Sequence, residues 1–178
     1  MLCSCAARSR HLALEVGLVG HEGMVGTSLA LGIEASPVRA LAQGSGSALR
    51  MSKAHFMKAL RQCPLLRREV FLYIHDLMTQ LMQIASCNRF HVVEARLARR
   101  LLMTDDRAAS TTFHLTHEFL ASMLGVRRVG VTKAANTLQQ QHLISYSRGE
   151  ITILDRRGLE AAACSCYKIL ETAKHDKH

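Results

Sequence analysis

The 178-residue sequence predicts an α+β protein with a glycine-punctuated β fragment, a long helix and a C-terminal winged helix-turn-helix. Three observations predict this class. Glycines recur through residues 12–51, apolar residues recur at spacings of four and three through residues 64–86, and residues 115–144 show two helical patterns separated by a glycine. The chain is long enough for one large domain or two small ones, each with a core.

The N-terminal part consists of short β-prone pieces between glycines. Seven glycines fall between residues 17 and 46, and pieces such as LEVGLV (14–19) and SALRM (47–51) lie beside them. This pattern predicts several short strands with tight turns, whereas residues 1–16 show only a short apolar alternation. Because about 40 residues cannot close a barrel, we expect only part of a β structure here.

Two helices are expected next, separated by a proline. Ser52 can cap the first helix, which would bury Phe56 and Leu60 together with Met57. Pro64 then restarts the chain, because proline is tolerated in the first turn of a helix. The second helix is expected to run to about residue 86, with Asn88 and Arg89 breaking the pattern.

The second of these helices carries an apolar seam with a heptad spacing. Its positions are four, three, four and three residues apart, and they are Val70, Ile74, Leu77, Leu81 and Ile84. The seam could pack within one chain. The flank is also apolar, however, at Phe71, Leu72, Met78 and Met82, so that one neighbour would not cover the helix. The pattern therefore favours a homodimer, with the five seam residues at its interface.

A further helix is predicted from His91 to about Met103. Its inward positions are apolar, namely Val92, Ala95, Leu97, Ala98, Leu101 and Leu102. Arg96, Arg99 and Arg100 are expected to stay outside the core or to reach phosphate. A polar loop over residues 104–112 then leads into a short strand at 113–115.

The stretch LTHEFLASMLGVRRVGVTKAANTLQQQHLI (115–144) carries the most specific pattern in the chain. Thr116 can cap a first helix, and Gly125 can end it where a left-handed backbone costs little. Ala121 is small and lets a second helix approach closely. A small residue, a glycine four positions later and the β-branched Val131 six positions after that are typical of a helix-turn-helix.

The second helix of this motif is expected to begin near Arg127 and to run to about Gln141. In a helix-turn-helix its first turns enter the major groove of DNA, so Arg127, Arg128, Val129 and Lys133 would face bases and phosphates. A net charge of +9 and a pI near 9.7 also favour an acidic partner such as double-stranded DNA. The alternative is an ordinary helix pair with solvated arginines.

Residues 143–154 alternate around Arg148-Gly149 and predict a β-hairpin. A hairpin directly after a recognition helix is a wing, whose tip would bring Arg148 to a backbone phosphate. The alternative for Arg148 is an ion pair with Glu150. With Thr116 at the start of the first helix, the candidate DNA-binding residues are Thr116, Arg127, Arg128, Val129, Lys133 and Arg148. A last helix is expected from Asp155 to about Thr172.

Other chemistry is not expected from this sequence. No C-x-x-C pair or zinc-finger spacing occurs among the six cysteines and ten histidines, so free thiols are expected and neither a metal nor a cofactor is predicted. No catalytic arrangement or phosphate loop is present, which argues against an enzyme. No segment reads as a signal peptide or a membrane span, and the expected location is the cytoplasm.

The order of these parts, from about residue 16 onward, resembles the Crp/Fnr family of bacterial transcription regulators. The resembling segments are HEGMVGTSLALG (21–32), ALRMSKAHFMKAL (48–60), EARLARRLL (94–102) and FLASMLGVRRVGVTKAANTLQQQHLISYSRGEITILDRRGLE (119–160). The resemblance implies a partial cyclic-nucleotide-binding-like β-roll with its following helix over 1–62, a dimerisation helix over 63–88 and a winged helix-turn-helix domain over 89–178. It also implies a homodimer that binds a two-fold symmetric operator and contacts RNA polymerase.

The chain departs from the family pattern at the nucleotide pocket. Members that bind cyclic AMP hold the ribose with a Gly-Glu pair and the phosphate with an Arg-Ser pair. Here the first pair is Gly26-Thr27, and the second falls near Glu34-Ala35, where a carboxylate would repel phosphate. Cyclic-nucleotide binding is therefore not expected, and the effector is left open. The cysteine cluster of iron-sulfur members is not reproduced either.

The recognition helix departs from the pattern as well. Many members carry an Arg-Glu pair there, and Arg128 matches the arginine whereas Val129 replaces the glutamate. Arg128 is therefore the best candidate for a base contact, on guanine. The first hypothesis is a homodimeric regulator of an inverted-repeat operator. The alternative is a regulator with a truncated N-terminal roll that modulates a full-length relative by heterodimerisation.

Overall fold

The computed structural model describes residues 3–8, 13–36, 38–44, 46–108 and 110–169. In its N-terminal part three strands form an antiparallel sheet in the order β2-β1-β3, with β1 at Cys3–Arg8, β2 at Ala13–Val19 and β3 at Val38–Ala42. A short 3-10 helix, η1 (Thr27–Leu31), separates β2 from β3 and is bounded by Gly26 and Gly32, both with positive φ. This is the partial β structure that the glycine pattern predicts.

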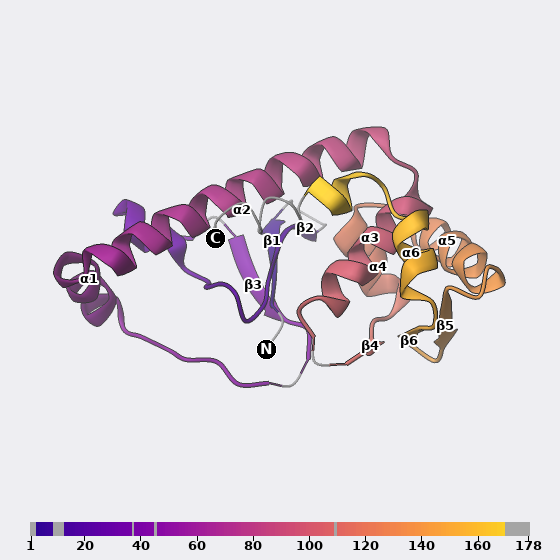
Figure 1. Cartoon of the computed structure of the whole chain (residues 1–178), viewed down its shortest axis with the longest axis horizontal. Coiled ribbons are helices and arrows are strands. Elements are labelled where there is room, and N and C mark those ends of the chain that lie inside the picture. Colours follow the sequence, from indigo (N-terminus) through magenta and orange to yellow (C-terminus); the bar gives the residue numbers. More distant parts are fainter. Residues whose placement is uncertain (1–2, 9–12, 37, 45, 109, 170–178) are drawn as a thin grey trace.

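Two details of the N-terminal part differ from expectation. The central strand is β1, which pairs with both β2 and β3, although the first 16 residues show little pattern. Segment 47–51 is not a strand but part of an exposed loop that leads to the next helix (Figure 1). A strand forms where a neighbouring strand offers backbone hydrogen bonds. Here the strand between β2 and β3 is β1, from the start of the chain, and not segment 47–51.

Helix α1 (Lys53–Gln62) begins at the predicted cap, where the Oγ atom of Ser52 accepts a hydrogen bond from the backbone N–H of His55 at 3.3 Å. Helix α2 (Pro64–Phe90) is the longest element and crosses the molecule (Figure 1). The predicted break at Asn88 and Arg89 is wrong. Asn88 and Arg89 both have a backbone N–H and a β-carbon, unlike proline and glycine, so both can continue a helix. The helix ends at His91, whose N–H donates to the carbonyl of Cys87 at 3.2 Å.

Helix α2 buries one face against its own chain. Val70 packs with Phe56 and Leu60, and the backbone N–H of Leu18 in β2 donates to Oε1 of Gln80 at 2.9 Å. The predicted seam is divided by this packing: Val70 and Ile84 are buried, Ile74 packs against the Val70 cluster, Leu77 is half-buried and Leu81 is exposed. Val70 and Ile84 are thus not available to a second copy, which corrects that part of the seam.

The face of α2 next to the buried one is apolar and exposed. We call this surface the α2 stripe, and its residues, with the exposed fraction of each, are Phe71 (43%), Met78 (54%), Leu81 (43%) and Met82 (63%). In Figure 1 the side of α2 that faces away from the sheet has no other element of the chain over it. Three residues of the stripe, Phe71, Met78 and Met82, belong to the apolar flank and not to the predicted seam. The exposed apolar surface therefore lies further round the helix axis than the seam, on the side of the flank.

The C-terminal part packs four helices and a second antiparallel sheet around one core (Figure 1). The elements are α3 (Val93–Asp105), β4 (Thr112–His114), α4 (His117–Leu124), α5 (Arg128–Gln140), β5 (Ile144–Ser147), β6 (Glu150–Ile153) and α6 (Arg156–Ala162), and the sheet order is β4-β6-β5. Residues with no exposed surface come from every helix of this part, among them Leu97, Leu120, Val131, Leu138 and Leu159. This is the predicted winged helix-turn-helix.

The three arginines of α3 are buried, although the sequence places them outside the core. Arg96, Arg99 and Arg100 are 6%, 4% and 1% exposed. Each guanidinium finds an acceptor inside the protein. Arg96 donates to the carbonyl oxygen of Leu124, Arg99 to the sulfur of Met103, and Arg100 pairs with Glu15 of β2 at 2.8 Å. Because these guanidinium groups are buried inside the protein, with Arg96 also bonded to Asn88 of α2 and Arg100 paired with β2, the three arginines do not reach phosphate.

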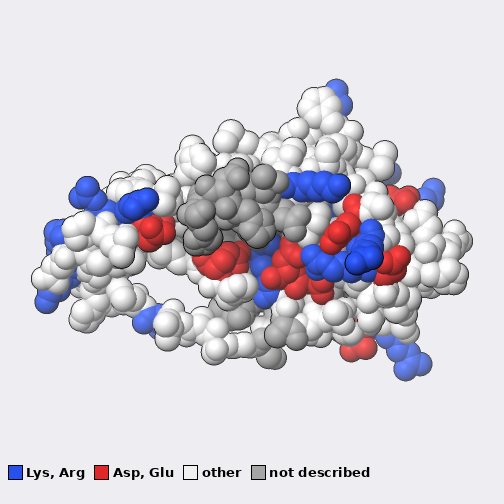
Figure 2. Space-filling view, viewed as in Figure 1, with Lys and Arg blue, Asp and Glu red and all other residues white. Residues whose placement is uncertain are grey.

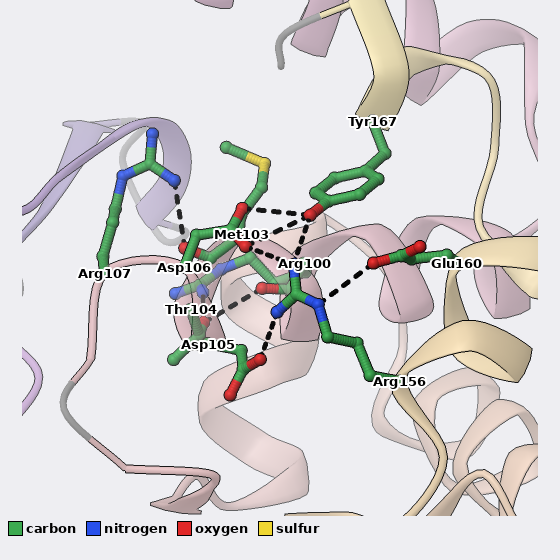
Figure 3. A network of polar contacts seen from close by, with 9 residues as sticks. All are labelled: Arg100, Met103, Thr104, Asp105, Asp106, Arg107, Arg156, Glu160 and Tyr167. Carbon is green, nitrogen blue, oxygen red and sulfur yellow. Dashed lines mark hydrogen bonds and ion pairs between the residues drawn. The ribbon is translucent and has the colours of Figure 1, made fainter.

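Arg156 joins the start of α6 to the end of α3 (Figure 3). Its guanidinium pairs with Asp105, with Asp106 at 2.7 Å and with Glu160 at 3.0 Å, and it donates to the hydroxyl of Tyr167 at 2.8 Å. The group binds α6 and the segment after it to α3.

Among the described residues, no helix combines the length and apolarity that crossing a bilayer requires.

The expected last helix is shorter than predicted. Helix α6 ends at Ala162, Ala163 is extended, and a further helical turn covers residues 166–169. The predicted end near Thr172 lies outside the described residues. The interruption lets the chain turn back so that Cys164 and Cys166 are buried against Cys87 of α2.

Candidate DNA-binding surface

The first helix of the motif is built as predicted. Oγ1 of Thr116 accepts a hydrogen bond from the N–H of Phe119 at 3.2 Å, and Gly125 ends α4 with a φ of 64°. The turn closes when the N–H of Val126 donates to the carbonyl of Ala121 at 3.0 Å. The left-handed backbone is what favours glycine at this position, whereas the methyl carbon of Leu14, 2.8 Å from a β-carbon placed at Gly125, could move aside.

The second helix, α5, has one buried and one exposed face. Its buried face consists of Val131, Ala134, Ala135 and Leu138, at the spacing of a helix packed on one side. Arg128, Val129 and Lys133 are exposed, and Val129 is 59% exposed although it is apolar. An exposed valine at this position is suited to contact with the methyl group of thymine.

The N-terminus of α5 is open to an anion. Arg127 occupies the capping position, is exposed and makes no side-chain cap. The first N–H groups of a helix without a cap, together with the positive end of its dipole, attract phosphate oxygens. Arg127 therefore lies beside Arg128 at the start of α5, and Thr116 is exposed beside the wing turn.

The wing forms as predicted. Arg148 and Gly149 have φ values of 50° and 87° and make the two-residue turn between β5 and β6. The hairpin is held to the motif because the N–H of Leu115 donates to the carbonyl of Gly149 at 2.8 Å. Arg148 is exposed, and within the described part of the chain it makes no ion pair with Glu150.

His117 connects α4, α5 and the wing, a role that the sequence does not reveal. Its ring stacks on Tyr146 of β5 with centroids 4.1 Å apart, and its Nδ1 atom lies 3.0 Å from Oγ1 of Thr132 in α5. The side chain is buried, and no described residue bonds to Nε2. Burial lowers the pKa of His117, and the positive charge of Arg128 lowers this pKa further.

The lowered pKa of His117 predicts a pH-dependent stability. The unfolded chain takes up a proton at this histidine near pH 6.5, and the folded protein does so only at lower pH. The contribution of His117 to the free energy of unfolding is therefore fully present above about pH 6.5 and is lost as the pH falls toward the folded pKa.

Urea unfolding of the wild type and of His117→Gln between about pH 5 and pH 8 measures this effect. We expect the difference in the free energy of unfolding between the two proteins to shrink as the pH is lowered. The two proteins share every other residue, so the contributions of the rest of the chain cancel in the difference. A difference that is constant across the range would contradict the assignment.

Two further residues on the exposed side of α5 were missed by the sequence reasoning. Thr132 and Asn136 follow Arg128 at intervals of four residues, so they share its face of the helix. Thr132 is held by His117 and by the carbonyl of Arg128, whereas Asn136 is exposed. Asparagine can bind adenine through two hydrogen bonds in the major groove. The spacing from Arg128 was the available signal.

The positive charge is not spread evenly over the molecule. Figure 2 shows basic residues gathered at the α1 end of one face, while acidic and basic residues are mixed toward the C-terminal part. At the end of α3 and in α6 the three carboxylates of Asp105, Asp106 and Glu160 share the single positive charge of Arg156, so this group carries an excess of negative charge. A DNA contact therefore depends on the cations of α5 and the wing rather than on the net charge.

Within residues 21–36, which the structure describes, the segment that resembles the nucleotide pocket contains no lysine or arginine to bind a phosphate. Gly26 precedes η1, and Thr27 begins it. Glu34 is 74% exposed and pairs with Lys53 of α1. The hydrogen bond and the positive charge of Lys53 lower the pKa of Glu34, which keeps the carboxylate charged.

Comparisons with known proteins agree with this architecture. Residues 95–162 match the Crp-like helix-turn-helix domain family. No curated protein sequence matches the chain.

Solved structures of Crp/Fnr-type regulators share the fold over most of this chain. A CRP-family regulator from Thermus thermophilus superposes with a TM-score of 0.73 at 20% identity, over 91% of this chain and 83% of the other. A second CRP/FNR-family regulator from that organism gives 0.63 at 22% identity over the same shares. FixK2 from Bradyrhizobium japonicum gives 0.65 at 14% identity, over 92% and 83%. Residues 95–162 are therefore a Crp-like helix-turn-helix domain, and the chain has the fold of the Crp/Fnr transcription regulators.

Proposed function

We propose that the protein is a homodimeric transcription regulator that binds an inverted-repeat operator. The observation that carries the proposal is the face of α5 that exposes Arg128, Val129 and Lys133 while its apolar face is buried in the core. Polar and basic side chains at the leading end of a rigidly held helix are suited to the edges of base pairs in the major groove.

Each residue has a role that follows from its place. Arg128 would donate two hydrogen bonds to a guanine, and Val129 would contact a thymine methyl group. Arg127 and Lys133 would hold backbone phosphates on either side of the groove. Arg148 would hold a phosphate at the tip of the wing, and Thr116 lies beside that tip and would contact the backbone there.

The dimer would form along the α2 stripe, whose four apolar residues are exposed in one chain. Of the predicted seam, Leu81 belongs to this stripe, and Ile74 and Leu77 lie at its margin, partly exposed. Two α2 helices packed in this way would hold two recognition helices about 34 Å apart, one turn of DNA. RNA polymerase is the proposed protein partner at the promoter.

Selection of bound sites from random double-stranded DNA by the purified protein tests the proposal. The expected result is an inverted repeat with half-sites about 10 base pairs apart from centre to centre. The affinity should fall steeply with salt, because each phosphate contact releases counterions. A protein that is monomeric and selects no sequence at low ionic strength would contradict the proposal.

Replacement of Arg128 by alanine is expected to weaken operator binding by about 1–3 kcal/mol for each half-site, which corresponds to about 5–150-fold for each of the two contacts in a dimer. The loss should be confined to operators that carry guanine at one position of each half-site, since a base contact has been removed. Titration of the operator and of variants at each position, followed by fluorescence anisotropy, measures both effects.

Two variants serve as controls for Arg128→Ala. Lys133→Ala should weaken binding to all sequences alike and lower the salt dependence, because it removes a phosphate contact. Arg157→Ala removes an exposed arginine from α6 and should leave binding unchanged. If Arg128→Ala leaves both affinity and sequence preference untouched, another residue reads the base, with Asn136 the next candidate.

A second candidate function uses the same exposed α2 stripe. Instead of a second copy, the stripe would bind the corresponding helix of a longer relative and modulate it. Co-expression of the two proteins distinguishes the cases: a persistent heterodimer with little operator affinity supports modulation, and separate homodimers that bind DNA support the first proposal.

A further inference from the structure

Four potential metal ligands from distant parts of the sequence meet at the end of α2. Cys87 lies in the last turns of α2, His91 follows the helix, and Cys164 and Cys166 lie in the segment after α6. Their ligand atoms all lie within 4.8 Å of one another, and the three cysteines are buried. The sequence spacing did not suggest this group, because 77 positions separate Cys87 from Cys164.

Two of the separations between ligand atoms already fit a tetrahedral ion, and all four atoms lie within 4.8 Å of one another. The Sγ atoms of Cys87 and Cys164 are 3.5 Å apart, and Sγ of Cys166 is 3.5 Å from Nδ1 of His91. Zinc bonds of about 2.3 Å to sulfur and about 2.0 Å to nitrogen place tetrahedral ligand atoms about 3.3–3.8 Å apart. Two sulfurs in a disulfide are only about 2.05 Å apart, so the present separation leaves room for an ion instead.

The surrounding structure holds the ligands in place. Cys87 and His91 are four positions apart at the end of one helix and point to the same side. Gln83, one turn earlier, donates an Nε2–H hydrogen bond to Sγ of Cys166 at 2.9 Å. Such second partners orient the ligands of metal sites and stabilise thiolate charge.

The charge around the four residues also fits a zinc-thiolate group. One Zn²⁺ with three thiolates and a neutral imidazole carries a net charge of −1. Arg99 is buried, and its positive charge acts on Cys87 and Cys164. Within the described part of the chain Arg99 has no carboxylate partner and its Nε atom has no hydrogen bond. A buried cation needs an opposite charge, and the metal group would provide it.

We propose that Cys87, His91, Cys164 and Cys166 bind one Zn²⁺ ion. Three thiolates and one imidazole in a closed tetrahedral arrangement are a ligand set for structural zinc, and soft sulfur ligands disfavour magnesium and calcium. The ion would join the end of α2 to the segment after α6 and so hold the long helix to the winged domain. This proposal does not depend on DNA binding.

Metal analysis of the purified, full-length protein tests the site. The wild type, prepared with a reductant and without added chelator, is expected to contain about one Zn²⁺ per chain. Cys164→Ser should lose most of this zinc. The control is Cys63→Ser, which changes an exposed cysteine at the start of α2 and should keep the full amount.

Titration of the reduced apoprotein with Co²⁺ gives a second readout that needs no destabilised variant. Tetrahedral cobalt-thiolate coordination produces intense visible and near-ultraviolet bands, and one equivalent of Zn²⁺ should remove them. His91→Cys retains four ligands and should increase the sulfur-to-cobalt absorption, since a fourth thiolate replaces the imidazole. Chelation should lower the melting temperature of the wild type but not that of Cys164→Ser.

Three outcomes would overturn the proposal. The first is a reduced wild type that binds no zinc and gives no cobalt-thiolate bands. The second is an equal loss of metal in Cys63→Ser and Cys164→Ser, which would mean adventitious binding. The third is a disulfide between Cys87 and Cys164 in protein purified under reductant.

Discussion

A Glu15→Ala variant is expected to be less stable than the wild type by about 3–5 kcal/mol. Glu15 of β2 and Arg100 of α3 form an ion pair at 2.8 Å, and their side chains are 8% and 1% exposed. Without the carboxylate the guanidinium stays buried with its charge unmatched. Gln43 and Thr104 accept hydrogen bonds from Arg100 but carry no charge. Equilibrium unfolding in urea measures the loss.

The control for this prediction is an exposed pair. The side chains of Glu34 and Lys53 are 74% and 52% exposed, so Glu34→Ala should leave the stability nearly unchanged. A double change of Glu15 and Arg100 to methionine should recover much of the loss, because neither charge then remains in the core. A Glu15→Ala variant no less stable than Glu34→Ala would mean that water reaches Arg100.

The second large effect is expected from charges placed on the α2 stripe. Met78→Glu combined with Met82→Glu puts two carboxylates where two copies would meet, and the dimer should dissociate. Operator binding should then weaken by about 100-fold or more, because each half-site would be bound by a separate protein. Sedimentation velocity measures the dissociation, and anisotropy titration measures the affinity.

Leu65→Glu is the matched control for the stripe. Leu65 is 64% exposed, lies at the start of α2, and points about 140° away from Met78 round the helix. This variant should remain a dimer with unchanged affinity. If the double variant stays dimeric while its circular dichroism is that of the wild type, the interface lies elsewhere.

The winged helix-turn-helix could be predicted because its determinants are local. Thr116 caps α4 through a residue three positions later, and Gly125 supplies the left-handed turn within the same segment. The wing follows from the conformations of Arg148 and Gly149 at its two turn positions. Residue type and spacing over a few positions are enough to specify such features.

The faces of the long helix were predicted less well. A heptad spacing identifies an apolar side of α2, but it cannot say which apolar residues the chain itself covers. Packing against α1 buries Val70, whereas Met78 and Met82 stay exposed. The same limit applies to Arg100, whose partner Glu15 lies on another element.

The sequence by itself determined that this protein has a glycine-bounded β fragment, a long helix and a basic helix-turn-helix with a wing. These features depend on capping, turn conformation and apolar spacing within single segments. Only the tertiary structure decided that β1 is the central strand, that the arginines of α3 are buried and that Cys87 meets Cys164. Each of these depends on contacts between residues far apart in the chain, which no local pattern records.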